Sequence, residues 1–409
     1  MHALMSPVRL IAGGLVATAA SLLTAAPASA QAMCDDAALV NPIVVTGTTS
    51  FEPTLRQLAL RLAAETAPRT IIYAIDSASS CGGIANVADA MDLGGKTGLH
   101  YTKSGATYVR DACTFAPGQK AHAAISDVFY ESCTNLPQPR PAELMDVVGP
   151  VQTTVFVVPS TDLTTQAITY EEARAIYGCG VSTARPVAGI SDPMASFCWN
   201  GDAGPPMVVA GTLGLPSSQM TPPKCSFGGG TVSAVTQNLL SYSSGGIHTI
   251  GFVTADVFDD VRASVNALAF RAQGQTSAFN PDSASTFPDR RNVRDGHYTL
   301  WGYEHVFAKT TGANLSPQAA ELVGWLTGTK LSASIDYVAL EGSAGLIPQC
   351  AMRVRRSSDG GLLSPYTPPE SCHCAFTAAI TRTLPPDCVA CTGNAMCTGG
   401  KVCRRGFCE

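Results

Sequence analysis

The sequence repeatedly places a run of β-branched apolar residues before a short turn of small residues and a helical pattern. The first such stretch is VVTGTTSFEPTLRQLALRLA, Val44 to Ala63, in which Gly47 to Ser50 lead into leucines at helical spacing. Those leucines predict a helix over 53–64. Further strands are predicted over 69–76 and 153–160, where apolar residues again dominate. Because strands alternate with helices, the sequence predicts an α/β fold with largely parallel sheets.

Two later helices have sequence signals at both ends. One is predicted over 169–178, where Thr169 as N-cap and Glu172 form a capping box. The other is predicted over 316–328, with Ser316 as the cap and a proline at the next position. A glycine ends each pattern, as is common just beyond a helix C-terminus.

Residues 1–30 have the pattern of a signal peptide. Arg9 precedes an apolar stretch, and Ala28-Ser29-Ala30 matches a cleavage site. We therefore predict an exported chain, periplasmic or extracellular and cleaved after Ala30. Cys34 would suit a lipid anchor, but residues 31–33 lack the small residue that lipid attachment needs. No later apolar run reaches about eighteen residues, so no membrane span is predicted.

The charge balance excludes one class of partner. The chain has 26 Lys and Arg residues against 31 Asp and Glu residues, a formal net charge of −5. A groove that binds nucleic acid needs a basic field to gather phosphates, so we predict no nucleic-acid partner. The short basic run Arg353, Arg355 and Arg356 is expected to lie on a solvated face rather than in a site.

Fifteen cysteines behind a signal peptide predict disulfides rather than catalytic thiols or metal ligands. Eight lie between Cys34 and Cys350, and seven lie between Cys372 and Cys408. The odd number leaves one cysteine free or paired with another chain. Sequence alone leaves the connectivity open. The short pairings considered among the alternatives are Cys113–Cys133 and Cys179–Cys198.

The composition changes after Cys350. Residues 351–371 are rich in Ser, Gly and Pro and read as a linker. Residues 372–409 have too few apolar side chains to build a core, so this small module is expected to depend on disulfides. The alternative, a zinc site at Cys388 and Cys391 with His373 nearby, is less favoured in an oxidising compartment.

Familiar catalytic motifs are absent from the sequence. It contains no H-E-x-x-H and no G-x-S-x-G, and its histidines show no metal-ligand spacing. The GGKT string at 94–97 lacks the earlier glycine of a phosphate-binding loop, because Ala90 stands there. We therefore predict a non-enzymatic protein without cofactor or metal. A hydrolase using Ser50 or Asp127 would lack a positioned base.

A set of small-residue turns remains at predicted strand ends: GTTSF, SASSCGG, AISD and SFGGGT. In open α/β sheets, ligands bind outside the carboxyl ends of strands, where helix N-termini offer free N–H groups to anions. Taken singly, each turn is better explained by the ordinary demand for small residues in turns.

In their order along the chain, these segments resemble the phosphate-binding branch of the periplasmic substrate-binding proteins of ABC transporters. The resemblance covers most of 41–346. It rests on VVTGTTSFEP, IIYAIDSASSCGGI, AISDVFY, VQTTVFVVPS, TYEEARAIYG, HTIGFVTADVFDD and NVRDGHYTLWGYEHVFA. It implies two α/β lobes with mixed sheets that close on a ligand by a hinge. Lobe 1 would comprise 31–150 and 297–350, and lobe 2 would comprise 151–296.

The resemblance also implies a ligand site. The hydroxyls of Ser50 and Ser80 and the backbone N–H of Phe51 would donate hydrogen bonds to phosphate. Asp127 would accept one from a protonated phosphate oxygen. Because a carboxylate repels a fully ionised anion, Asp127 would favour a ligand that keeps a proton over sulfate.

The second lobe departs from the family pattern. No Arg-x-x-x-Ser-Gly-Thr string occurs, so the bidentate charge partner is missing. Its place falls either in 198–216, which has Ala203-Gly204-Pro205 for the triplet, or in 226–240, where Gly230 and Thr231 open a helix. The candidates for a replacement cation are Arg291, Arg294 and His297.

These patterns together predict an exported, monomeric solute-binding protein for phosphate or a related small oxyanion. Its partner would be an ABC transporter permease or a surface protein. The alternative is a binding-protein fold reused as a surface or adhesion module, with 372–409 as the interaction element.

Overall fold

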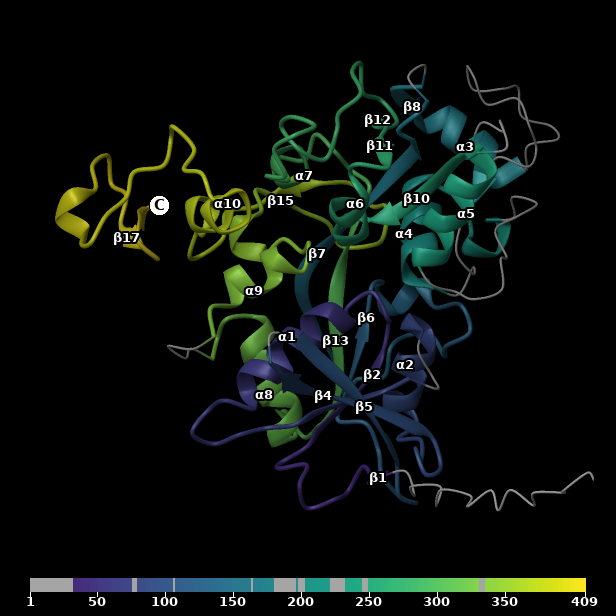
Figure 1. Ribbon diagram of the computed structural model, residues 1–409, viewed down its shortest axis with the longest axis vertical. Coiled ribbons are helices and arrows are strands. Elements are labelled where there is room, and N and C mark those ends of the chain that lie inside the picture. The colour runs from purple at the N-terminus through teal and green to yellow at the C-terminus, as the bar shows by residue number, and fades with distance from the viewer. Residues whose placement is uncertain are drawn as a thin grey trace, which may run out of the picture. The chain divides into compact units, whose positions relative to one another are not determined.

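The computed structural model describes most of the chain beyond residue 31. The described residues are 32–75, 79–105, 107–162, 165–179, 196–197, 203–220, 232–244, 249–330 and 335–409. They form a mixed α/β structure, which confirms the predicted fold class (Figure 1). The predicted signal peptide lies outside them.

Most strands of the described part join one sheet in the order β1-β5-β4-β3-β2-β6-β13-β7-β10-β9, with β11 on β7 and β14 on β13. Its first six strands in sequence are β1 (Ala32–Met33), β2 (Ile43–Gly47), β3 (Ile71–Ala74), β4 (Thr97–Ser104), β5 (Thr107–Thr114) and β6 (Ala123–Ser126). The others are β7 (Leu144–Pro159), β9 (Ser196–Phe197), β10 (Ile250–Thr254), β11 (Val265–Ala267), β13 (Trp301–Thr311) and β14 (Asn314–Leu315). Three short pairs lie outside this sheet: β8 (Ala167–Thr169) with β12 (Ala269–Arg271), β15 (Val354–Arg355) with β16 (Ser364–Pro365), and β17 (Cys403–Arg404) with β18 (Phe407–Cys408).

The sheet is mixed rather than largely parallel. Strand β2 pairs in parallel with β3 and β6, whereas β13 is antiparallel to β6 and β7, and β7 is antiparallel to β10. The long strands β7 and β13 therefore connect the group β1–β6 to the group β9–β11 (Figure 1). The repeating strand–turn–helix pattern gave the α/β class, but it did not reveal the hairpin of β4 and β5 or the two crossing strands.

The helices are α1 (Glu52–Leu62), α2 (Ser80–Ala88), α3 (Tyr170–Cys179), α4 (Gly204–Thr212), α5 (Val232–Ser244), α6 (Ala255–Val261), α7 (Arg291–Arg294), α8 (Pro317–Leu326), α9 (Tyr337–Ser343) and α10 (His373–Thr381). The helices predicted from 53, 169 and 316 are confirmed as α1, α3 and α8. The capping box is present, because Thr169 N donates to Glu172 Oε2 (2.9 Å) and Glu172 N donates to Thr169 Oγ1 (3.2 Å). No helix among the described residues is long and apolar enough to cross a membrane.

Separate apolar clusters support the two groups of strands. Helix α1 buries Leu55 and Leu58 in a cluster that also contains Trp325 of α8. A larger cluster surrounds Phe156 of β7 and Trp301 of β13. Since this second cluster includes side chains of both crossing strands, the crossover is part of the packed core rather than a loose connection.

Six disulfides occur in the described part: Cys34–Cys113, Cys81–Cys133, Cys350–Cys372, Cys374–Cys388, Cys391–Cys403 and Cys397–Cys408. The suggested pair Cys113–Cys133 is wrong. Strand β1 pairs with β5 and brings Cys34 beside Cys113, while Cys81 on α2 meets Cys133. The suggested pair Cys179–Cys198 lies outside the described residues. The zinc alternative is wrong because the sulfurs of Cys388 and Cys391 are consumed in disulfides.

The segment 351–371, called the strap below, has specific contacts with the rest of the molecule. Arg353 and Arg355 are exposed as expected, but Arg356 is only 6% exposed. Its guanidinium lies 3.8 Å from the ring centroid of Trp301 and donates to the Trp301 and Thr299 carbonyls. The expectation of a solvated face is therefore wrong for Arg356.

The strap ends at the Cys350–Cys372 disulfide, and α10 follows it directly. Helix α10 packs against α9, and Phe376 belongs to the same apolar cluster as Trp301 (Figure 1). The Glu409 carboxylate accepts hydrogen bonds from the backbone N–H groups of Cys374 and Ala375 at the start of α10. The strap and α10 are thus packed on the preceding fold.

Candidate functional site

Three of the predicted site residues meet at one point. Asp127, directly after β6, accepts hydrogen bonds from the hydroxyls of Ser50 and Ser80; the Ser80 oxygen lies 3.2 Å from Asp127 Oδ2. Thr48, which the sequence reasoning did not single out, donates to Asp127 Oδ2 at 2.6 Å. All four side chains are at most 9% exposed. They form a closed cluster of one carboxylate and three hydroxyls.

Close backbone approaches bring these turns together. Gly47 has φ +122°, and a side-chain carbon there would lie 1.9 Å from the Ile125 carbonyl oxygen. A side-chain carbon on Gly83 of α2 would lie 2.4 Å from Gly47 Cα. Small residues in GTTSF and SCGG therefore have a packing reason of their own, since only glycine allows β2, β6 and α2 to approach so closely.

Three helices of the described part begin at this cluster. Ser50 lies just before α1, and Ser80 is the first residue of α2, whose N-cap Ser79 accepts from Gly82 N at 3.0 Å. Gly204 is the first residue of α4, and a side-chain carbon on it would lie 1.9 Å from Asp127 Oδ2. Helix N-termini favour nearby negative charge, which helps to explain how Asp127 can be 1% exposed.

The other predicted ligand residues, Phe51, Gly230 and Thr231, are not shown to contact Asp127 in the described part of the chain. The Phe51 ring is buried in the α1 cluster, and its carbonyl accepts hydrogen bonds from Thr54 and Leu55. Its N–H as a ligand donor stays a prediction. Gly230 and Thr231 lie outside the described residues. Of the two segments proposed for the missing motif, 198–216 contains α4, whose first residue Gly204 lies against Asp127, and 226–240 contains the start of α5.

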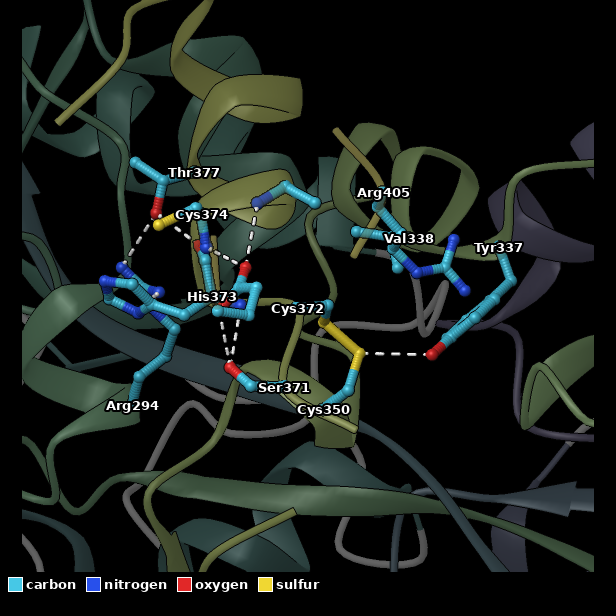
Figure 2. The surroundings of a disulfide bond; sticks show 12 residues. Arg294, Tyr337, Val338, Cys350, Ser371, Cys372, His373, Cys374, Thr377 and Arg405 are labelled. Carbon is cyan, nitrogen blue, oxygen red and sulfur yellow. Dashed lines mark hydrogen bonds between the residues drawn. A yellow bond between two sulfur atoms is a disulfide. The ribbon is translucent and has the colours of Figure 1, made fainter. Parts of the chain in front are cut away.

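The candidate replacement cations are engaged elsewhere. Arg294 is 1% exposed and lies 2.6 Å from His373 Nδ1 and 3.2 Å from Thr377 Oγ1 in α10 (Figure 2). Burial lowers the pKa of Arg294 to about 10. Arg291 faces Asp295 at 3.6 Å, and His297 stacks on Phe279. None of the three is therefore a partner of Asp127.

Sequence reasoning missed two polar side chains on the crossing strands. Glu304 of β13 is 1% exposed, and Gln152 of β7 is 4% exposed. Among the described residues, no donor reaches either carboxyl oxygen of Glu304, and neither amide atom of Gln152 has a hydrogen-bond partner. Burial raises the pKa of Glu304 well above its usual range, and so do the charge of Asp127 and a hydrogen bond between the two carboxyl groups. An acidic residue inside the apolar strand segment TLWGYEHVFA was the available signal.

The strap contacts both the segment after β6 and helix α4, which meet at Asp127. Asp359 Oδ2 accepts hydrogen bonds from Phe129 N (3.0 Å) and Ser132 Oγ (2.6 Å), just after β6. Its backbone lies on α4, because a side-chain carbon on Gly211 would come within 2.9 Å of the Asp359 carbonyl oxygen. The disulfide Cys350–Cys372 closes this segment at its base (Figure 2). The strap therefore holds α4 near β6.

No known protein family and no curated protein sequence matches the chain. Among solved structures, a Clostridium perfringens protein with bound phosphate has a TM-score of 0.47 and 14% identity, over 75% of this chain and 99% of that one. An ABC-type phosphate transport receptor from Vibrio cholerae has 0.44 and 14%, over 75% and 99%. A Corynebacterium glutamicum OxyR variant has 0.36 and 9%, over 70% and 63%. Similarity at these levels assigns no ligand to this chain.

Proposed function

We propose that this chain is an exported, non-enzymatic solute-binding protein that takes a small, protonated oxyanion such as phosphate around Asp127. One observation carries the proposal: hydroxyls from Thr48, Ser50 and Ser80 and the starts of three helices converge on a single buried carboxylate. Hydroxyl donors and helix N-termini are the groups that bind oxyanions in proteins.

The same carboxylate defines which oxyanion fits. Asp127 would repel a fully ionised ligand, but it accepts a hydrogen bond from a ligand oxygen that keeps its proton. Phosphate has such an oxygen near neutral pH, whereas sulfate has none. Within the described part of the site no cation faces Asp127, so selectivity would rest on donors and acceptors rather than on a charge pair.

Ligand entry requires the cluster to open. The hydroxyls donate to Asp127 itself, and Gly204 of α4 covers its carboxylate. An incoming oxyanion would take over these donors after α4 and the strap move away from β6. Tight closure without ligand is consistent with a solute-binding protein that alternates between open and closed forms.

Thermal unfolding of the secreted chain tests the proposal directly. Phosphate at about a hundred times Kd should add roughly 2.7 kcal/mol to the free energy of unfolding and raise Tm by several degrees. Ser80→Ala should reduce that shift. Ser316→Ala, which removes the cap of α8 far along the chain, is the matched control and should retain it. Absence of any shift with phosphate and arsenate would reject the oxyanion assignment.

A second candidate is a surface or adhesion module of the same fold. The observation that favours it is the disulfide-rich segment 388–408, which has exposed Val389 and Met396. A variant lacking residues 385–409 should then lose retention at the cell surface while keeping its phosphate response. Loss of transport with normal surface retention would instead favour a transporter partner.

A further inference from the structure

The side chains of Glu304 and Gln152 lie close to Asp127, and no described donor reaches their oxygen atoms. Gln152 lies directly opposite Gly302 in the antiparallel pair of β7 and β13, and opposite residues in such a pair share a face of the sheet. On that face, a side-chain carbon on Gly302 would meet Val208 of α4 at 2.7 Å and the Asp127 carbonyl oxygen at 3.0 Å. Gln152 therefore points toward α4 and the segment of Asp127.

Glu304 lies beside Asp127. In the antiparallel pair of β13 and β6, His305 is opposite Ser126, so Glu304 and Asp127 come next in the same register. The charge of Asp127 acts on the Glu304 carboxyl. The Asp256 charge at the start of α6 also reaches Glu304, and Asp256 Oδ1 has no partner among the described residues. The charges of Asp127 and Asp256 both act on Glu304, and no described cation is among the groups that act on it.

Such groups rarely remain without partners in a folded protein. A buried polar atom without a hydrogen bond costs about 1–3 kcal/mol, and more if it is charged. Glu304 and Gln152 together place four such atoms beside the proposed ligand site. A bound ligand that donates hydrogen bonds would satisfy the three oxygen atoms, whereas Gln152 Nε2 is itself a donor and needs an acceptor.

We infer that the ligand is a zwitterion: an oxyanion whose phosphate-type end takes the Ser50 and Ser80 hydroxyls and whose ammonium group lies between Glu304 and Gln152. This inference rests on the proposed function. Carboxylate and amide oxygens are acceptors, and an ammonium group offers three donors together with the positive charge that an acidic cluster lacks. The ligand would thereby supply the cation that the family pattern takes from arginine.

Calorimetric titration of the whole secreted chain can test this with three probes. These are 2-aminoethylphosphonate, ethylphosphonate, which lacks the amine, and ethylamine, which lacks the oxyanion. We expect 2-aminoethylphosphonate to bind at least about tenfold more tightly than ethylphosphonate, as for a desolvated charge pair. In Glu304→Gln this ratio should fall to about one.

Glu341→Gln is the matched control. Glu341 on α9 is also a 1% exposed acid with an unpartnered oxygen, but it is not among the groups that act on Glu304. This variant should keep the tenfold ratio, so that loss of the ratio in Glu304→Gln is not a general effect of removing a buried acid. Thermal unfolding of both variants checks that each is folded.

Each outcome separates the two proposals. Equal binding of the two phosphonates overturns the zwitterion and leaves the oxyanion site standing. Binding of ethylamine without either phosphonate overturns the zwitterion, but supports Glu304 as the ammonium partner. A response to Mg²⁺ or Ca²⁺ that is lost in Glu304→Gln, without an amine preference, replaces the ammonium by a metal ion. Failure of all probes overturns the zwitterion, and the thermal response to phosphate then decides whether the oxyanion site stands.

Discussion

Asp127 and Glu304 are two equally buried acids with opposite surroundings. Each is 1% exposed, yet Asp127 accepts hydrogen bonds from three hydroxyls, whereas no described donor reaches the oxygens of Glu304 and its carboxyl bonds to Asp127 itself. Burial alone therefore says little about the state of a carboxyl group. The hydrogen-bond donors around a buried carboxyl group decide whether that group stabilises or destabilises the folded protein.

The largest effect should come from removing the well-partnered acid. Asp127→Ala leaves the hydroxyls of Thr48, Ser50 and Ser80 buried without their shared acceptor, and we expect a loss of about 3 kcal/mol of unfolding free energy. Urea unfolding at pH 7 measures this. Asp127→Asn, which keeps an acceptor, should lose less. Equal stability of Asp127→Ala and the parent protein would remove the basis of the comparison.

The strap contains a third acid whose donors come from another part of the fold. Asp359→Ala takes the acceptor away from Phe129 N and Ser132 Oγ, and we expect a loss of about 2 kcal/mol. Hydrogen exchange should also quicken in α4 and after β6, because the strap no longer connects them. Asp387→Ala, at a 57% exposed aspartate, is the control. Unchanged exchange in α4 would contradict the holding role of the strap.

Glu304→Gln should raise the free energy of unfolding, whereas Asp127→Ala should lower it. Because the folded-state pKa of Glu304 is raised, the folded protein binds this proton more tightly than the unfolded chain, and stability falls as pH rises above the unfolded value. Glu304→Gln has no such group to titrate, so it should not lose this stability as the pH rises. Relative to the parent protein it should gain up to about 1.4 kcal/mol per pH unit across this window. Urea unfolding at pH 5 and pH 8 tests the sign; a gain that shrinks toward pH 8 would refute it.

The smallest expected loss of stability comes from removing one of the three hydroxyls that donate to Asp127. Ser80 is one of three donors to Asp127, so Ser80→Ala should cost about 1 kcal/mol, far less than losing the carboxylate. Denaturant unfolding of Ser80→Ala beside Asp127→Ala gives the ratio. If the serine variant is as unstable as the aspartate variant, the cluster acts as a unit rather than as separate pairs.

Local signals predicted much of the first part of the fold. The caps at Thr169 and Ser316 and the helix after Pro53 follow from short sequence patterns, and the structure contains them. The meeting of Ser50, Ser80 and Asp127 was expected from the family resemblance of the ordered turns, and the structure brings these three residues together. Such features depend on neighbouring residues and on the common rule that strand ends share one edge of a sheet.

The missed features depend on residues far apart in the chain. Gln152 reaches the site only through its register with Gly302, and Asp359 through a contact with Ser132 across 227 positions. The pairing of Cys34 with Cys113 likewise follows from β1 joining β5. No local sequence pattern encodes contacts between residues so far apart in the chain. For this reason the composition of 351–371 predicted only a linker.

The position of the strap in the sequence sets an order of events during folding. The hydroxyls, Asp127 and α4 all precede residue 213, but Asp359, which connects their surroundings, belongs to a segment that is synthesised later and closed by oxidation of Cys350 and Cys372. Until that segment has emerged and its thiols have been oxidised, α4 lacks this attachment to β6. The protein should therefore acquire its closed site late, after both groups of strands have formed and these two thiols have been oxidised.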